Sequence, residues 1–100
     1  MESIYKIVWT KEANVNLDQI ISYLEKEWTV KEIKNFFVKL EKAITLLTAR
    51  PLLFRATNKS KQIHRCVLTR QVSIYYKIVN ETIVILSIFD NRQNPSKQKH

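Results

Sequence analysis

The chain of 100 residues contains no glycine, one cysteine and two histidines, and each scarcity excludes a class of function. Without glycine there is no Walker loop, dinucleotide-binding fingerprint or nucleophile elbow, because each needs a strained turn or a close approach to phosphate that glycine allows. Enzymes that depend on these motifs are therefore excluded. We expect no cofactor and no small-molecule substrate.

Metal binding and membrane insertion are also poorly supported. His64, His100 and Cys66 stand at no zinc-ligand spacing, so no metal site is expected. The lone cysteine agrees with a reducing compartment, and its apolar neighbours favour a packed small hydrophobe over a nucleophile. No apolar run approaches the roughly 20 residues of a membrane span, and residues 1–6 lack the features of a signal peptide. We therefore expect a cytoplasmic protein with no membrane partner.

Acidic residues are absent between Glu41 and Glu81, and the excess positive charge is concentrated there. The basic residues of this segment are Lys42, Arg50, Arg55, Lys59, Lys61, Arg65, Arg70 and Lys77. The other nine basic residues are matched by nine acidic ones, so this segment accounts for the net charge of +8. Like charges on one surface attract polyanions or acidic protein segments. The alternative is a solvated surface that only keeps the protein soluble, but four of the eight are arginines, set among apolar strand residues.

The first part of the chain predicts a short strand followed by an amphipathic helix. Alternate residues of the segment 4–9 share a face, as in a strand. Thr10 is placed to cap a helix, which ends near Trp28. Its apolar residues recur at helical spacing: Ala13, Leu17, Ile20, Ile21, Leu24 and Trp28.

A second helix is predicted directly after the first. Thr29 and Glu32 fit a capping box, in which each side chain satisfies a free backbone N–H of the other. The apolar stripe of this helix consists of Ile33, Phe36, Phe37, Leu40, Ile44 and Leu47. Pro51 ends the helix and begins a loop over residues 52–60 that is expected to be exposed. Two helices joined by so short a turn are expected to pack as an antiparallel hairpin.

The last forty residues change to the period of strands, predicted over 62–69, 72–79 and 82–89. Short links make these strands antiparallel neighbours. In the middle strand Val72, Ile74, Tyr76 and Ile78 should face the helices, leaving Ser73, Tyr75, Lys77 and Val79 on the opposite face. The sequence thus predicts a single α+β domain over residues 1–100, with the order β-α-α-β-β-β. Its helical hairpin would pack on one face of a mostly antiparallel four-stranded sheet.

Two groups of residues carry a resemblance to a known family. Trp9, Ala13, Leu17, Ile20 and Tyr23 have the spacing of a W-x-x-x-A-x-x-x-L-x-x-I-x-x-Y pattern. The second group comprises the segments His64–Leu68, Ser73–Ile78 and Ile85–Pro95, the last of which runs from a strand into an arginine-containing tail. With this order of elements the chain resembles the RelE/ParE superfamily of bacterial toxins over nearly its whole length, and within it the ParE-like branch.

The resemblance implies a growth-inhibiting toxin of a type II toxin–antitoxin pair, neutralised by a cognate antitoxin that wraps over the folded domain. Such pairs are linked to plasmid stabilization. The ParE-like branch is associated with blocking DNA gyrase, which would make the protein a binding inhibitor and not an enzyme. The cationic sheet and tail would then engage the target, with Arg65, Arg70, Tyr75, Lys77 and Arg92 as the target-binding residues.

The alternative is a RelE-like endoribonuclease, an interferase that acts on the ribosome and cuts mRNA in the A site. Cleavage by the 2′-hydroxyl needs a base, an acid and cations for the developing phosphorane charge. The candidate catalytic residues are His64, Arg65, Tyr75 and Arg92. Two differences from the RelE-like catalytic residues disfavour this function. No tyrosine follows Phe89, and Ser73 stands where the RelE-like central strand has a phosphate-binding arginine.

Each candidate also has a purely structural interpretation. The sequence shows no carboxylate that would orient the imidazole of His64, so His64 would be an ordinary strand residue. Tyr75 would pack against the tail, and Asp90 would pair with Arg92 to make the tail a clasp. A third function is a protein of this fold that has lost toxicity and survives as a partner-binding module.

Overall fold

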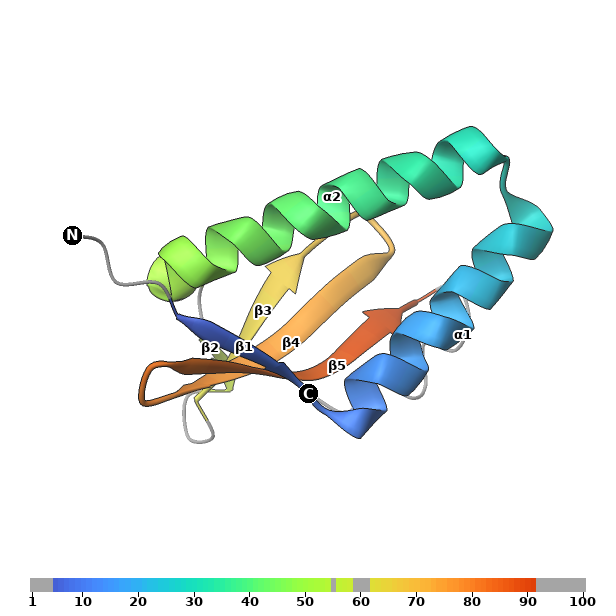
Figure 1. The fold of residues 1–100 in the computed structure, drawn as a ribbon. Coiled ribbons are helices and arrows are strands. Elements are labelled where there is room, and N and C mark those ends of the chain that lie inside the picture. Colours follow the sequence, from blue (N-terminus) through green and yellow to red (C-terminus); the bar gives the residue numbers. More distant parts are fainter. Residues whose placement is uncertain (1–4, 55, 59–61, 92–100) are drawn as a thin grey trace.

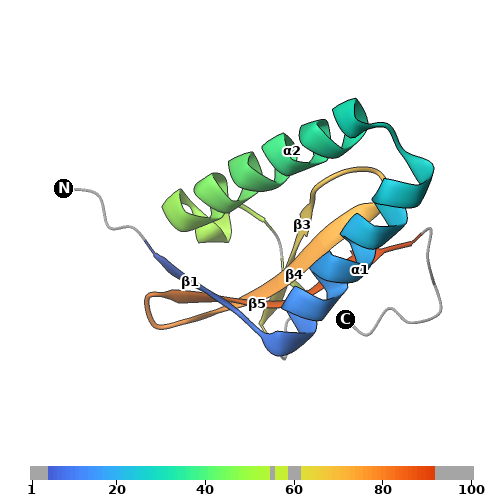
Figure 2. The ribbon, with the colours of Figure 1, turned by 45° about the vertical axis from the view of Figure 1, so that its right-hand side comes forward.

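The computed structural model describes residues 5–54, 56–58 and 62–91. Both helices pack on one face of a sheet, as Figures 1 and 2 show. The α+β class and the position of the helical hairpin are therefore confirmed. In chain order the elements are β1 (Lys6–Trp9), α1 (Lys11–Glu27), α2 (Val30–Ala49), the 3-10 turn η1 (Pro51–Leu53), β2 (Ala56–Asn58), β3 (Ile63–Val67), β4 (Val72–Val79) and β5 (Thr82–Asp90).

The sheet contains the four expected strands and a short fifth one. Its order is β1-β5-β4-β3-β2, with β1 parallel to β5 and all other neighbours antiparallel. The prediction of an uninterrupted loop over residues 52–60 is wrong, because η1 and β2 lie there. β2 pairs with β3 through Ala56 opposite His64. Three residues are too few to show the alternation by which a strand is recognised.

Thr10 joins the first helix to the sheet. Its Oγ1 accepts a hydrogen bond from Ala13 N at 3.1 Å, which confirms the predicted N-cap of α1. The same hydroxyl lies 2.8 Å from the carbonyl oxygen of Ile85 and 3.0 Å from that of Leu86. Leu86 sits where the pairing of β4 and β5 shifts register, so the hydroxyl meets the sheet at a bulge. The start of α1 is therefore held on β5.

The two helices meet at the predicted capping box. Thr29 N donates to Glu32 Oε1 at 3.1 Å, and Glu32 N donates to Thr29 Oγ1 at 3.3 Å. Figure 1 shows that α1 and α2 diverge from this connection toward their other ends. Within the described part of the chain, no helix is long and apolar enough to cross a membrane.

The core lies between the helices and β3, β4 and β5. Its buried members are Ala13, Ile20, Leu24, Phe36, Leu40, Leu47, Cys66, Val72, Ile74, Tyr76, Ile83, Ile85 and Ile88. Trp9, Trp28 and Ile78 are partly buried against it. The predicted helix-facing side of β4 is thus confirmed, and both tryptophans pack on the core as expected.

In a chain without glycine, the turn between β4 and β5 uses asparagine. Asn80 has φ = 57°, in the left-handed region that asparagine tolerates better than most residues do. Its short side chain thus stands at a position that glycine would often occupy.

We expect the Asn80→Gly variant to keep the free energy of unfolding of the wild type. The Asn80→Ala variant should lose about 1 kcal/mol, because the Cβ of alanine disfavours a left-handed backbone. Urea unfolding followed by circular dichroism checks both values. An alanine variant as stable as the glycine variant would contradict a left-handed requirement at this turn.

Candidate target-binding face

The sheet face that points away from the helices holds three of the predicted target-binding residues. In the register of β3, β4 and β5, Arg65 pairs with Tyr75, and Tyr75 pairs with Ser87. Ser73 and Lys77 lie two residues to either side of Tyr75, so they share its face. We call this surface, formed by Arg65, Ser73, Tyr75, Lys77 and Ser87, the outer sheet face.

Arg65 is the exposed cation of this surface, and its side chain is oriented by a neighbouring strand. Its Nε donates a hydrogen bond to Ser73 Oγ at 3.1 Å. The bond fixes one edge of the guanidinium while its terminal nitrogens still carry donors for a carboxylate or phosphate. Ser73 itself is buried. The guanidinium of Arg65 is thus oriented by its neighbour on β4.

Tyr75 and Lys77 differ from Arg65 in exposure. The Tyr75 side chain is only 1% exposed, whereas Lys77 is half-buried. Among the described strand residues, no aspartate or glutamate occupies this face, since Asp90 is paired with the core residue Val72. Among the described strands, the outer sheet face therefore carries positive charge with no acidic side chain beside it.

The structure places His64 on the opposite side of the sheet. His64 pairs with Tyr76, whose ring stacks on the imidazole with a centroid distance of 5.2 Å and an interplanar angle of 18°. His64 Nδ1 lies 2.9 Å from the carbonyl oxygen of Phe54, and the side chain is 7% exposed. Tyr76 Oη donates to the carbonyl oxygen of Pro51 at 2.6 Å. Together the two rings attach the segment after α2 to the sheet, and His64 does not meet Tyr75.

Cys66 is a core residue, as its apolar neighbours in the sequence predicted. Burial raises the pKa of its thiol to about 11, so the nucleophilic thiolate is scarce at neutral pH. Burial, and after it the nearby Cys66, raises the pKa of Tyr76 as well. The described residues hold no group of three His, Cys, Asp or Glu side chains arranged to bind a metal ion.

The described basic residues between Glu41 and Glu81 do not form one surface. Lys42 lies exposed on α2 and Arg50 at its C-terminal cap, on the helical side of the sheet. Arg65 and Lys77 lie on the outer sheet face, and Arg70 lies at the turn between β3 and β4. Arg55, Lys59, Lys61 and the predicted target-binding residue Arg92 lie outside the described residues. The expectation of a single cationic surface is thus wrong for the five described residues, because the segment contributes to both sides of the sheet.

Sequence reasoning missed the role of Ser73. That residue was interpreted as the loss of a phosphate-binding arginine, whereas its hydroxyl orients Arg65 of the neighbouring strand. Strand alternation already placed Ser73 on the side of Tyr75. The diagonal contact with Arg65 depends on the register of β3 against β4, which the sequence does not specify.

Solved toxin–antitoxin structures share this fold. The chain resembles a structure from the chromosomal ParDE system of P. aeruginosa, with a TM-score of 0.71 and 15% identity over 89% of this chain and 98% of that one. It also resembles a chain of the RelBE2 complex of Mycobacterium tuberculosis, with a TM-score of 0.61 and 16% identity over 87% and 98% of the two chains. For a chain of the E. coli DinJ-YafQ complex the values are 0.62 and 10% over 90% and 96%. The fold is that of the RelE/ParE toxins.

The sequence gives the family directly. A family model described as the ParE toxin of the type II toxin–antitoxin system parDE matches residues 7–95, and the chain belongs to this family. It is therefore a type II toxin of the RelE/ParE superfamily. Comparison with curated protein sequences found no match.

We expect His64→Ala to lower the free energy of unfolding by about 2 kcal/mol, because it removes a partly buried hydrogen bond and an aromatic stack. The adjacent exposed residue gives a matched control, and Arg65→Ala should change stability by less than about 0.5 kcal/mol. Both values follow from urea unfolding. A His64→Ala variant as stable as the wild type would contradict the attachment of the segment after α2 to the sheet through His64.

Proposed function

We propose that residues 1–100 form a single toxin domain that inhibits a cytoplasmic target by binding it, and that the target is DNA gyrase. The observation that supports binding over catalysis is the division of residues between the two faces of the sheet. The outer sheet face presents the oriented cation Arg65 and half-buried Lys77, whereas His64 lies on the helical side. The chain belongs to the ParE toxin family. The choice of gyrase follows from the resemblance to the ParE-like branch, which is associated with blocking this enzyme.

The described residues of the outer sheet face do not supply the acid and the base that cleavage of mRNA needs. A base must reach the attacking 2′-hydroxyl and an acid must reach the leaving oxygen, each within hydrogen-bond distance. Tyr75 is 1% exposed, and the imidazole of His64 is engaged at Nδ1 beneath the opposite side of the sheet. Binding needs no proton transfer. Arg65 can hold a carboxylate or phosphate of the target with two parallel hydrogen bonds.

Growth inhibition after induced expression separates the two mechanisms. We expect Arg65→Ala to weaken inhibition by about ten-fold or more, since a charge-assisted contact with the target is lost. Tyr75→Phe keeps the packed ring and removes only the hydroxyl, so toxicity should persist. Lys34→Ala, which removes a similar exposed cation from α2, is the control and should remain toxic.

Two results would contradict binding through the outer sheet face. One is full toxicity in the Arg65→Ala variant. The other is loss of toxicity in Tyr75→Phe, together with ribosome-dependent cuts in mRNA that the wild type makes and this variant does not. The second result would favour the RelE-like endoribonuclease, because only a reaction that moves a proton through this hydroxyl depends on it.

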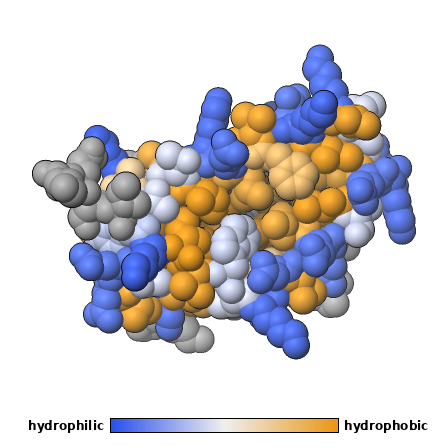
Figure 3. Space-filling model, viewed as in Figure 1, coloured by the Kyte–Doolittle hydropathy of each residue, from blue (hydrophilic) through white to orange (hydrophobic). Residues whose placement is uncertain are grey.

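We infer that a cognate antitoxin binds the apolar surface between the helices and β1. Figure 3 shows a continuous band of apolar side chains between α2 and the lower elements, α1 and β1. Val30, Phe37 and Ile44 follow one another at intervals of seven along α2, so they share one side of the helix. Val30 is 69% exposed and Phe37 is 42% exposed. An exposed apolar stripe of this kind fits the apolar face of an amphipathic segment.

The net charge of the protein favours an acidic antitoxin segment. A protein with net charge +8 attracts an anionic chain over several ångströms, and salt screens this attraction. Apolar contacts with Phe37 and its neighbours are insensitive to such screening. We expect a segment that is disordered alone and folds on the toxin.

Replacing Phe37 with alanine should weaken binding of the cognate antitoxin by about ten-fold or more, as for a central aromatic anchor. Val38→Ala is the matched control, because Val38 is 51% exposed but lies on another side of the helix, and it should bind within about two-fold of wild type. Titration calorimetry at low and at high salt measures the affinity of each variant and how much of that affinity depends on salt. Equal weakening by the two variants, or affinity independent of salt, would contradict this docking surface.

A further inference from the structure

Three residues at the centre of the outer sheet face are buried, although no described element lies over them. Tyr75 is 1% exposed, Ser73 is 5% exposed and Ser87 is 6% exposed. Ser87 pairs with Tyr75, and Ser73 lies two residues before Tyr75 on β4, so the three residues form one patch. Both helices pack on the opposite side of the sheet (Figures 1 and 2). The burial of this patch therefore needs a cover other than the helices.

The size of the tyrosine side chain makes this burial informative. On an open sheet face side chains stand roughly perpendicular to the sheet, so the outer end of a tyrosine ring would project into water. Neighbouring side chains can shield the flanks of the ring, but Arg65, which pairs with Tyr75 on β3, is itself exposed. The burial also arises within a single copy of the chain. The cover is therefore another part of this chain.

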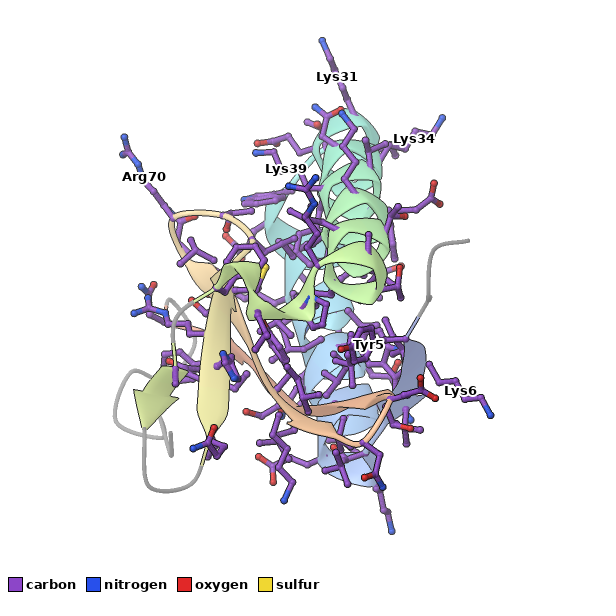
Figure 4. All side chains as sticks on the ribbon, turned by 90° about the vertical axis from the view of Figure 1, so that its left-hand side faces the viewer. Tyr5, Lys6, Lys31, Lys34, Lys39 and Arg70 are labelled. Carbon is purple, nitrogen blue, oxygen red and sulfur yellow. The ribbon has the colours of Figure 1, made fainter. Side chains whose placement is uncertain are left out.

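The long basic side chains of α2 and of the turn between β3 and β4 do not supply the cover. Figure 4 shows Lys31 and Lys34 projecting from α2, and Arg70 extending outward from the turn. All three are exposed, so none of them packs against the buried patch.

The described chain ends close to the patch. Asn91 follows β5, and its N donates a hydrogen bond to the carbonyl oxygen of Gln71 at 2.9 Å. Gln71 directly precedes β4, so the chain leaves the sheet two residues away from Ser73. The nine residues 92–100 then follow. Nine extended residues can span about 30 Å, whereas Tyr75 lies only about 13 Å along the strand from Gln71.

The other residues outside the described ranges are 1–4, 55 and 59–61. The first of these segments leads into β1, where Lys6 pairs with Thr82 at the end of β5 farthest from Asn91. The last leads into β3, where Ile63 pairs with Lys77, again toward the far end of the sheet. Residue 55 precedes β2, which is separated from β4 by β3. The C-terminal segment is thus the one that starts beside the patch.

We propose that residues 92–100 dock on the outer sheet face of their own chain, over Ser73, Tyr75 and Ser87. The patch offers three hydroxyl groups, each of which can donate and accept a hydrogen bond. The segment has the sequence RQNPSKQKH, in which every side chain except that of Pro95 is polar. Hydrogen bonds between the segment and the patch would satisfy the polar groups that docking buries.

Docking changes the surface that a target meets, and this consequence rests on the proposed function. The segment contains Arg92, Lys97 and Lys99 but no acidic residue. On the outer sheet face these cations would join Arg65, which stays exposed beside the patch. Tyr75 would then contact the segment and not the target. The docking itself does not depend on what the toxin inhibits.

Photo-cross-linking of the full chain identifies the cover. Tyr75 is replaced by the photoreactive amino acid p-benzoylphenylalanine, which keeps an aromatic ring at this position. We expect irradiation to link this ring to residues 92–100 of the same chain, which peptide mapping by mass spectrometry detects. The same replacement of Tyr23, which packs against the core on the helical side, is the control and should give no link to this segment.

Nitration by tetranitromethane measures the cover without a bulky probe. In the wild type Tyr75 should react at least about ten-fold more slowly than Tyr5, because Tyr75 reacts only when the segment opens. Tyr5 lies near the start of β1 (Figure 4) and is half-buried. A variant whose residues 92–100 are replaced by nine glycines and serines should nitrate Tyr75 as fast as Tyr5. Tyr76, which is 0% exposed on the helical side, should stay unreactive in both proteins.

Three results would overturn the proposal. The first is cross-linking from position 75 only to other segments, or to none. The second is a cross-linked dimer, which would assign the patch to a second copy of the chain. The third is equal nitration of Tyr75 in the wild type and the variant while Tyr76 stays unreactive. If Tyr76 reacts, the variant is unfolded and the cross-link decides. Toxicity is not a readout here, so a failure of the proposed function is distinguishable from a failure of docking.

Discussion

The alternation of side chains along β3 and β4 decides which residues of this toxin can reach a partner. Within β3, His64 and Cys66 point to the helices, and Arg65 between them points outward. Thr10 reinforces this arrangement by joining the start of α1 to β5 at the bulge around Leu86. A slip of one residue would exchange the two faces, burying a guanidinium and exposing a thiol, which the cost of burying a charge forbids.

Because side chains alternate along the strands, residues with different roles lie on separate surfaces of the protein. On the helical side the ring of His64 helps attach the segment after α2, through the carbonyl oxygen of Phe54. On the other side the same strand offers Arg65, oriented by Ser73. The apolar band beside α2 lies on a further surface. An antitoxin bound at the apolar band would therefore leave the outer sheet face for a target, unless another part of it extended around the sheet.

Local signals in the sequence predicted much of this fold, because helix caps and strand alternation act between near neighbours. Thr10, Thr29 and Pro51 mark the helix ends, and the bounds of β4 were predicted without error. The features that depend on contacts between residues far apart in the sequence were not predicted. β2 is recognisable only through its pairing with β3, and the hydrogen bond from Arg65 to Ser73 requires the strand register.

The most direct test of inhibition by binding compares two activities of one purified preparation. Increasing amounts of the wild-type protein are added to DNA gyrase, ATP and relaxed plasmid, and to a translation reaction whose mRNA is then mapped by primer extension. Our account predicts that the plasmid stays relaxed once toxin and gyrase are near equimolar, while the mRNA remains uncut. Normal supercoiling together with cuts at ribosome-bound codons would contradict it.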